Sequence, residues 1–336
     1  MRTRWMIATS ATALLGATML TQGTPHLNPM IDLLAAHKPI FGLYAPNNRR
    51  PPARPGAPAT PATTPRTPAE LAADAMTQPA SDYIFDGAME HDFDAGYTSF
   101  ADFVAGLKSG GLLQATPIKR LRLPLVVKTP EIAPDAAKAR ERISRQLNLG
   151  VSTIVFVGAE SASEVEEGLK MMRFTRQGGT RPDAVGSAPA LWGMREKEYR
   201  EKADLWPLNP KGELVNWTIV ESKVGLAHIR EIAAVKGISV LFPGAGTLRG
   251  VFSSTDASGK RVVDEVAWEG AVQQVLAACK EFHVPCGYPA VLGDIEMRMK
   301  QGFSVFVIGW GDSGFKTVEL GRRLAGRAAT NAEEWR

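Results

Sequence analysis

Residues 217–249 read W-T-I-V-E-S-K-V-G-L-A-H-I-R-E-I-A-A-V-K-G-I-S-V-L-F-P-G-A-G-T-L-R. The stretch predicts an apolar strand that ends in a lone carboxylate, Glu221, followed by an amphipathic helix, a second apolar strand and a glycine-rich turn. Such a βαβ unit pairs its two strands in parallel. Because parallel α/β folds keep their chemistry at the carboxyl ends of the strands, Glu221 is the first candidate functional residue.

The same alternation extends outward over most of the chain. Strand-like runs cover residues 40–44, 82–85, 124–127, 153–157, 215–220, 239–242, 286–290 and 303–309. Helical patterns cover residues 69–76, 100–107, 135–149, 163–173, 225–235, 268–283, 292–301 and 313–324. Eight βα units in about 290 residues predict a single-domain (β/α)8 TIM barrel. A doubly wound sheet is the alternative, but the first strand lacks the phosphate-binding glycine loop usual in that fold.

The composition is that of a globular protein with little sign of nucleic-acid binding. A chain of 336 residues with 44% hydrophobic content can bury a large core. The formal net charge of +4 is small for this length, and no run of Lys and Arg interleaves with aromatic residues. Disordered and fibrous classes are therefore excluded, and a nucleic-acid partner is not expected.

The N-terminus differs from the rest of the chain. Arg2 and Arg4 precede an uncharged stretch at residues 5–20 that is rich in Ala, Thr, Leu and Met. This pattern predicts a signal peptide over residues 1–25, and export to the periplasm or the outside of the cell. A membrane anchor is the competing interpretation, but the run is short and diluted by Thr, Ser and Gly, so no stable span is expected after processing. Residues 26–336 then form the barrel domain.

Two segments break the alternation. Residues 47–68 are rich in Pro and poor in large apolar side chains, which predicts an extended insertion within the domain. The unit at residues 158–216 contains turn-forming residues and a charged, aromatic stretch. A long connection of this kind is often a lid or a subunit contact.

Cys279 and Cys286 lie seven residues apart and are too few for a zinc cluster or a disulfide framework. Cys279 falls in a helical pattern and Cys286 opens a strand, which favours two small buried hydrophobic residues. A single disulfide in an oxidising compartment is the alternative.

The barrel places a short set of polar residues at one rim, each after a predicted strand: Glu90, His91, Lys128, Glu160, Glu221 and Thr247. The imidazole of His91 suits proton transfer near neutral pH, and Lys128 can bind an anion or form a Schiff base. Glu221 can hold Mg²⁺ or Mn²⁺ together with water and substrate oxygens. Each of the three also has a structural alternative: His91 as a surface histidine, Lys128 as a solvated lysine, and Glu221 as a helix-capping carboxylate.

Several pieces occur in a specific order from about residue 39 to residue 324. They are Gly42-Leu-Tyr44, Glu90-His91, the strand P-L-V-V-K at 124–128, L-G-V-S-T-I-V-F-V at 149–157, S-A-S-E-V-E at 161–166, and Val220-Glu221 with I-A-A-V-K-G at 232–237. In these the chain resembles the HpcH/HpaI aldolase and citrate lyase family, the class II pyruvate-dependent aldolases.

The resemblance implies a carbon–carbon lyase that cleaves a 4-hydroxy-2-oxo acid reversibly, giving pyruvate or a similar enolate on a divalent metal, Mg²⁺, Mn²⁺ or Co²⁺. It implies Glu221 as metal ligand, His91 for proton transfer, Lys128 at the place of a substrate-binding Arg, and the Gly246-Thr247 turn as backbone donor to the substrate carboxylate. It also implies a homo-oligomer.

The chain departs from the family pattern at three places. Thr247 stands where the family has a second metal ligand, an Asp; Lys128 replaces the Arg; and Ile219 replaces a substrate-binding Gln. A hydroxyl is a poorer ligand than a carboxylate, and Lys lacks the planar fork of Arg. Two alternatives therefore stay open: a non-catalytic protein of the same fold that binds a small organic acid, and a metal-free lyase with Lys128 as Schiff base.

Overall fold

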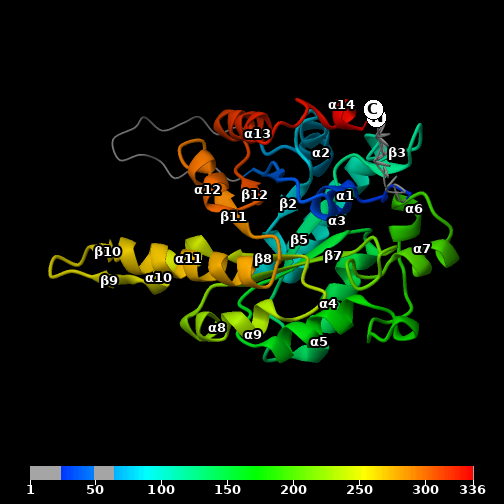
Figure 1. Cartoon of the computed structure of the whole chain (residues 1–336). Helices are drawn as coiled ribbons and strands as arrows, with labels where there is room; N and C mark the ends of the chain where they lie inside the picture. Colours follow the sequence, from blue (N-terminus) through cyan, green and yellow to red (C-terminus); the bar gives the residue numbers. More distant parts are fainter. Residues whose placement is uncertain (1–23, 49–63, 336) are drawn as a thin grey trace, which may run out of the picture.

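Eight parallel strands alternate with helices around a nearly closed barrel, shown in Figure 1. The computed structural model describes residues 24–48 and 64–335. The predicted signal peptide over residues 1–25 therefore lies outside the described residues except for its last two positions. The predicted insertion at residues 47–68 lies outside them from residue 49 to residue 63. The barrel strands are β1 (Ile40–Tyr44), β2 (Ile84–Asp86), β5 (Leu125–Thr129), β6 (Thr153–Phe156), β7 (Val215–Val220), β8 (Val240–Pro243), β11 (Gly287–Ala290) and β12 (Val305–Ile308).

The strands pair in the order β11-β12-β1-β2-β5-β6-β7-β8. Between the two ends of this sheet, Leu241 of β8 forms a parallel bridge to Cys286, and its N–H donates to the Pro285 carbonyl at 3.0 Å. The predicted single-domain TIM barrel is thus confirmed, and each of the eight predicted strand runs overlaps one barrel strand.

Helices surround the barrel, and each of the eight predicted ranges overlaps at least one of them. They are α1 (Pro29–Ala35), α2 (Pro68–Met76), η1 (Ala88–Glu90), α3 (Phe93–Ser109), α4 (Ala136–Asn148), α5 (Ala162–Met172), η2 (Thr175–Gln177), α6 (Ala188–Leu191), α7 (Glu196–Lys202), α8 (Lys223–Ala227), α9 (Ile229–Ala233), α10 (Ala245–Val251), α11 (Glu265–Glu281), α12 (Ile295–Gln301), α13 (Asp312–Leu324) and α14 (Asn331–Glu334). The short α1, η1, η2, α6, α7, α10 and α14 were not predicted. Two short hairpins add β3 (Leu113–Gln114) with β4 (Arg120–Leu121), and β9 (Ser253–Thr255) with β10 (Arg261–Val263).

Local capping explains where the boundaries differ from the prediction. The helix predicted from residue 100 begins at Phe93, because the Asp92 side chain accepts the Ala95 N–H and caps it there. The single helix predicted over residues 225–235 is split at His228, which ends α8 and begins α9. The His228 ring bonds the Glu160 carbonyl at 2.9 Å and so ties this break to the loop after β6.

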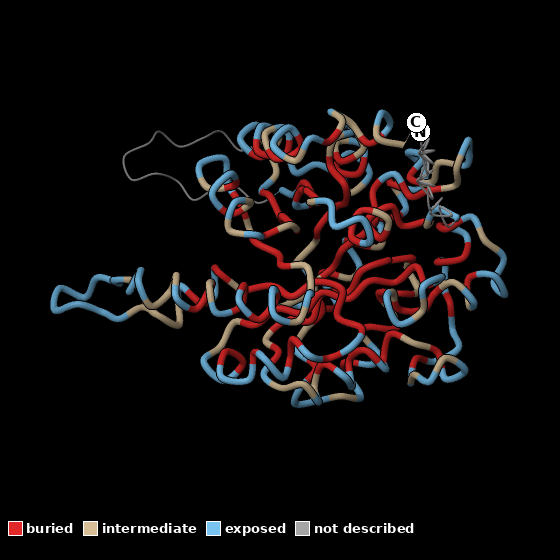
Figure 2. Tube along the Cα trace, in the orientation of Figure 1, coloured by how far each residue is buried: buried red, intermediate tan, exposed pale blue. Residues whose placement is uncertain are grey.

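The core has two layers, and Figure 2 shows that buried residues follow the strands and the inward faces of the helices. The larger cluster lies between the barrel and its helices. The second includes inward-facing side chains of the strands, among them Phe85, Trp217 and Phe242. The hairpin β9–β10 projects from the end of the barrel where α10 lies and is mostly exposed (Figures 1 and 2).

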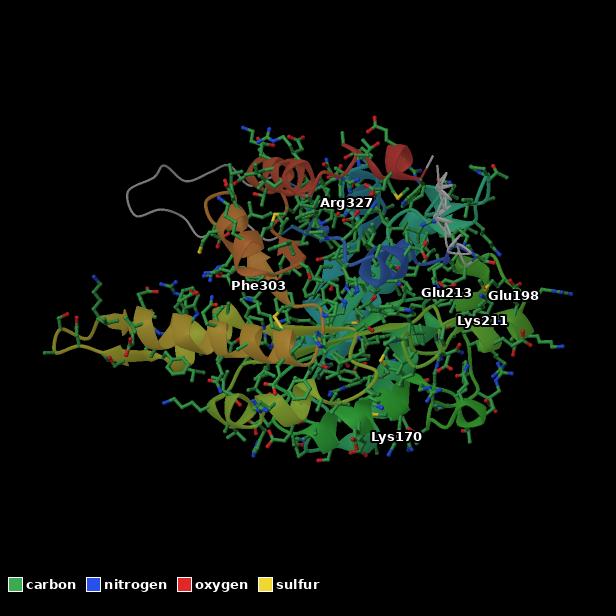
Figure 3. The ribbon with its side chains drawn as sticks, in the orientation of Figure 1. Lys170, Glu198, Lys211, Glu213, Phe303 and Arg327 are labelled. Atoms are coloured by element: carbon green, nitrogen blue, oxygen red, sulfur yellow. A yellow bond between two sulfur atoms is a disulfide. The ribbon has the colours of Figure 1, made fainter. Side chains whose placement is uncertain are left out.

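The irregular unit after α5 does not cover the barrel mouth. Its buried Trp192 donates to the Gly150 carbonyl at 2.8 Å, just before β6, and Tyr199 Oη donates to the Leu147 carbonyl at 3.1 Å. It therefore packs at the amino ends of the strands, and the expectation of a lid was wrong. Glu213, which precedes β7 and accepts the Asn28 N–H at 3.0 Å, lies at the same end in Figure 3.

The two cysteines are joined in a disulfide with a Cα–Cα distance of 5.6 Å. The interpretation of two unpaired hydrophobic residues was wrong, although both side chains are buried. The bond links α11 to the residue before β11, next to the seam where β8 and β11 meet. Within residues 24–48 and 64–335, no helix is long and apolar enough to cross a membrane.

Candidate active site

Two adjoining cavities lie at the carboxyl ends of the barrel strands. The inner one, of about 180 Å³, is lined by Tyr44, Phe85, Lys128, Trp217, Ile219, Glu221, Phe242, Pro243, Gly244, Ala245, Gly246, Thr247, Pro289 and Val307. The outer one, of about 220 Å³, is lined by Tyr44, Ala45, Asn47, Phe85, Asp86, Gly87, Ala88, Glu90, His91 and Lys128. The structure thus brings four predicted residues, Lys128, Glu221, Gly246 and Thr247, to the inner cavity, and His91 to the outer one.

Glu221 follows the last residue of β7 and is half-buried. Its Oε1 accepts the Gly158 N–H at 3.1 Å, from the loop after β6. Its carbon stem and Oε2 lie so close to Gly244 that a Cβ at position 244 would overlap them. The absent side chain at Gly244 therefore leaves the space in which the carboxylate sits.

Lys128, in β5, points its ammonium at Glu90, which ends η1. The Lys128 Nζ to Glu90 Oε2 distance is 2.8 Å, and both side chains are only 17% exposed. The His91 Nε2 lies 3.9 Å from the same Glu90 oxygen, but its ring is 88% exposed. Glu90 thus connects the two predicted residues: it holds Lys128 at the wall shared by the cavities, while His91 stands at the solvent side.

The three departures from the family pattern all lie at the inner cavity. Thr247 and Gly246 are exposed in the first turn of α10, and Ile219 is buried beneath Glu221 on β7. Lys128 lies on β5, which one strand, β6, separates from β7. The described lining of the cavity therefore includes one carboxylate, one ammonium and two hydroxyl-bearing residues, Tyr44 and Thr247, beside apolar side chains.

Tyr44 is a candidate that the sequence analysis did not single out. It is the last residue of β1 and lines both cavities, with its ring in edge contact with Phe85 at 4.9 Å. Burial, and then the negative charges of Glu90 and Asp86, raise the pKa of Tyr44 to about 12. Its hydroxyl is thus a neutral hydrogen-bond donor at neutral pH. Its position at the end of the first strand, within Gly42-Leu-Tyr44, is the signal that could have identified it.

Further acids lie near Glu221 but outside the inner cavity. Glu131 approaches Gly158, and partial burial followed by the charges of Glu164 and Glu221 raises its pKa. Glu160 accepts the Ser222 hydroxyl at 2.6 Å. Across the described part of the chain, no three or more His, Cys, Asp or Glu side chains are arranged to hold a metal ion. Neither Glu131 nor Glu160 lines the inner cavity, where Glu221 is the acid among the described lining residues.

The chain matches no protein-family model, and no curated protein matches its sequence. Solved structures do match. One is an HpcH/HpaI aldolase/citrate lyase family protein from Burkholderia cenocepacia J2315, at 19% identity and a TM-score of 0.62 over 89% of this chain and 97% of that chain. Another is macrophomate synthase, at 17% identity and a TM-score of 0.57 over 97% and 100% of the two chains. A third is the HpcH/HpaI aldolase from Desulfitobacterium hafniense DCB-2, at 15% identity and a TM-score of 0.55 over 88% and 95%.

The chain shares their barrel fold. At this level of identity the likeness establishes architecture and not chemistry, because one fold carries many activities. The resemblance drawn from the sequence pieces and the likeness of the structures point to the same group of proteins. The chemistry has to be argued from the cavity.

Proposed function

We propose that the protein is a carbon–carbon lyase that reversibly cleaves a 4-hydroxy-2-oxo acid or a related oxo-acid to pyruvate or a similar enolate. One observation carries the proposal: a single cavity at the carboxyl ends of the strands is lined by both a carboxylate, Glu221, and an ammonium, Lys128. A 2-oxo acid needs a cation for its carboxylate and an electrophile for its oxo group. Lys128 in the cavity would supply the cation directly.

The donors present fit a divalent cation bound through few protein ligands. Mg²⁺ is commonly held by one or two carboxylates, and substrate and water complete its shell. Glu221 would hold it, with the Thr247 hydroxyl nearby at the same wall. A metal bound there would stabilise the enolate that forms when the aldol bond breaks. Because the site has one carboxylate instead of two, the affinity of the protein for the cation should be low.

The chain's own residues would bind the substrate and move its proton. Lys128 would bind the substrate carboxylate, and Glu90 keeps the ammonium in place. In the cleavage direction the C3–C4 bond breaks, the 4-hydroxyl proton passes to a base and C3 is later protonated. His91, exposed at the outer cavity, would exchange that proton with solvent. Tyr44 would donate a hydrogen bond from the shared wall.

The test is the Mn²⁺-dependent release of pyruvate from 4-hydroxy-2-oxo acids by the purified protein. We expect Glu221→Gln to lower activity by at least about 100-fold and to weaken Mn²⁺ binding in a calorimetric titration. Glu198→Gln is the matched control, since Glu198 is exposed on α7 at the opposite end of the molecule (Figure 3). Wild-type activity and Mn²⁺ affinity in Glu221→Gln, or no turnover of any oxo-acid, would refute the proposal.

A second candidate is a non-catalytic protein that binds a small organic acid. Thr247 at the place of an acid favours it, because the cavity then lacks a second carboxylate for the metal. Calorimetry distinguishes the two: binding of a carboxylate ligand without any binding of Mn²⁺ or Mg²⁺ supports this candidate. The Schiff-base alternative is less favoured, since an ammonium held in an ion pair is not a nucleophile. Borohydride trapping with pyruvate would test it.

Export and assembly complete the proposal. The disulfide between Cys279 and Cys286 supports an oxidising location, such as the periplasm or the outside of the cell. A homo-oligomer is proposed from the resemblance alone. Mass spectrometry of the mature N-terminus would test export, and light scattering would test the homo-oligomer.

A further inference from the structure

Two further cavities lie at the amino ends of the barrel strands, on the face opposite to the candidate active site. The larger, of about 730 Å³, is lined by Ser239, directly before β8. The smaller, of about 310 Å³, is lined by Ser304, directly before β12. The cavities share a wall, because five residues line both: Leu34, His37, His283, Val284 and Pro285.

The larger cavity has a recessed apolar lining. Trp206 and Phe282 in this lining are half-buried, and Val235 and Ile238 are buried. Among the large apolar side chains that are exposed in the described chain, only Leu208, at 42%, lines either cavity. Ligand cavities of this size are commonly apolar with few polar groups. A hollowed apolar surface can take up one apolar chain, whereas a surface that enters a bilayer projects its apolar side chains.

The smaller cavity is basic. No Asp or Glu is among the described lining residues of either cavity, and the charged or titratable ones are His37, Lys38, Lys280 and His283 in the smaller cavity and Lys236 in the larger one. Lys38 is already paired with Glu334 at 3.1 Å. Lys280 is exposed and has no ion-pair partner among the described residues. An anion in this cavity would therefore meet one unbalanced ammonium beside two imidazoles.

The two histidines stand where glycine is usual. His37 follows the end of α1 with a φ of 52°, and His283 follows the end of α11 with a φ of 54°. In both places the N–H of the next residue donates at 2.9 Å to the carbonyl four residues before the histidine, which is the helix-ending motif that commonly has glycine in this left-handed conformation. No other non-glycine residue of the described chain has a positive φ.

A side chain in this conformation costs free energy, and residues held so are often functional. His37 and His283 come from helices far apart in the chain, and both are exposed and line both cavities. A shared role in binding a ligand gives a reason for an imidazole at both positions.

The disulfide fixes the wall that carries His283. Cys279 and Cys286 close the short segment between α11 and β11, which contains His283, Val284 and Pro285. A wall that is fixed before binding loses less conformational freedom when a ligand binds. The bond therefore prepares this part of the two cavities.

We propose that the two cavities form one binding site for a free fatty acid, with the carboxylate at Lys280, His37 and His283 and the acyl chain in the larger cavity. The observation that carries the proposal is a basic compartment and an apolar one that share the wall bearing both histidines. A single-chain anionic amphiphile needs both at once, because its head requires charged donors and its tail an apolar lining. The site is at the other end of the barrel from Glu221 and does not rest on the proposed function.

Calorimetry with the purified protein tests the ligand class with octanoate, decanoate and laurate, each below its micelle-forming concentration. We expect each two-carbon step to tighten binding about tenfold, because more of the chain leaves water. 1-Decanol should bind about tenfold more weakly than decanoate, because it has no charge for Lys280. No dependence on chain length, or equal binding of decanol and decanoate, would overturn the proposal.

Variants of the basic wall test the place of the carboxylate. Lys280→Gln should weaken decanoate binding about tenfold and leave decanol binding unchanged. Lys108→Gln is the matched control, because Lys108 is exposed in the last turn of α3, a helix of 17 residues like α11, and lines neither cavity. Wild-type affinity for decanoate in Lys280→Gln would contradict the assignment.

The histidines allow a test that does not depend on a damaged fold. His37→Gly and His283→Gly should each weaken decanoate binding about threefold or more. Neither should lower the melting temperature, because glycine adopts the left-handed conformation without strain. Wild-type affinity in both variants would overturn the role given to the imidazoles.

Two other occupants of this face are distinguished by the same protein. Binding of phosphatidylglycerol vesicles without binding of dissolved laurate would assign the face to a membrane and overturn the proposal. A dimer that dissociates in Leu208→Asp, with no laurate binding in either state, would assign it to a second copy and overturn it as well. Pyruvate release should be equal in Lys280→Gln and the wild type, and its absence from both would refute the lyase without affecting this site.

Discussion

At the scale of single residues, the barrel mouth holds an ion pair, Lys128 with Glu90, and a carboxylate, Glu221, outside it. Lys128 is paired with Glu90 at 2.8 Å, while among the described residues Glu221 accepts the Gly158 N–H and has no ion-pair partner. A divalent cation at the mouth would therefore meet one unbalanced carboxylate. Thr247 adds no charge to this set, so under the proposed function we expect a cation here to bind weakly.

Gly244→Ala tests whether the position of Glu221 matters. The new methyl group would overlap the Glu221 side chain and displace its carboxylate. Because displacement of a catalytic group by about 1 Å can cost about 100-fold, we expect a loss of pyruvate release in the range of about 10- to 100-fold, with weaker Mn²⁺ binding by calorimetry.

The matched control is Gly270→Ala in α11, where an added methyl group meets nothing within 4 Å. It should leave both measurements unchanged. Mn²⁺ affinity in Gly244→Ala equal to that of the wild type would show that the carboxylate is not constrained by this glycine.

At the scale of elements, neighbouring helices are tied by ion pairs on the outer layer. Glu269 of α11 accepts two hydrogen bonds from Arg298 of α12, at 2.6 and 2.8 Å. The Arg298 side chain is almost fully buried, so it depends on this partner. Hydrogen bonding from Arg298 lowers the pKa of Glu269 from its ordinary value of 4.5.

This pair gives a pH dependence of known sign. Since the pKa is lower in the folded state, the pair stabilises the protein above about pH 4.5, and the gain is lost as pH falls through the folded-state value. Glu269→Gln should cost about 1–3 kcal/mol at pH 7 and reduce the loss of stability at acid pH. Melting curves measured from about pH 3, below the ordinary pKa of a Glu side chain, up to about pH 7 would measure both effects.

Glu296→Gln is the control within α12, because Glu296 is an exposed partner of Lys300 in the same helix. Its melting temperature at pH 7 should match the wild type. If Glu269→Gln melted like the wild type across the whole pH range, the α11–α12 pair would have no role in stability.

At the scale of the whole molecule, a buried network joins the first strands to the C-terminal segment. Asp82, 2% exposed, accepts hydrogen bonds from Arg322 at 2.9 Å, from Arg327 at 2.6 and 2.9 Å, and from the Phe41 N–H at 2.8 Å. Arg327 appears above the barrel near α13 and α14 in Figure 3. The network connects residues that are about 240 positions apart in the chain.

Removing Asp82 should destabilise the entire barrel. Asp82→Ala would leave the two buried guanidinium groups with Glu334 as their remaining carboxylate partner, at a cost of about 3–5 kcal/mol in the free energy of unfolding. Urea titration would measure it. The control, Asp183→Ala, removes an exposed partner of Arg200 and should cost less than about 1 kcal/mol. Equal unfolding midpoints for the two variants would contradict this role of Asp82.

The periodic pattern was enough to predict the eight strands, because a buried parallel strand is a local apolar run and needs no long-range information. It also placed Glu221, Lys128 and Thr247 at strand ends. It did not predict the hairpin β9–β10, which is short and exposed and buries little apolar surface. Nor did it predict the break at His228, where a contact with Glu160 across the chain competes with helix propensity.

What the sequence by itself determined is therefore the alternation of elements, the barrel and the candidate residues at its rim. The tertiary structure alone decided which of them meet. The Lys128–Glu90 pair and the place of Tyr44 at the wall shared by the two cavities depend on the packing of neighbouring strands, and the Cys279–Cys286 bond depends on how the chain turns from α11 to β11. Periodicity is set by neighbours along the chain, whereas these contacts join side chains whose separation is fixed only when the strands pack.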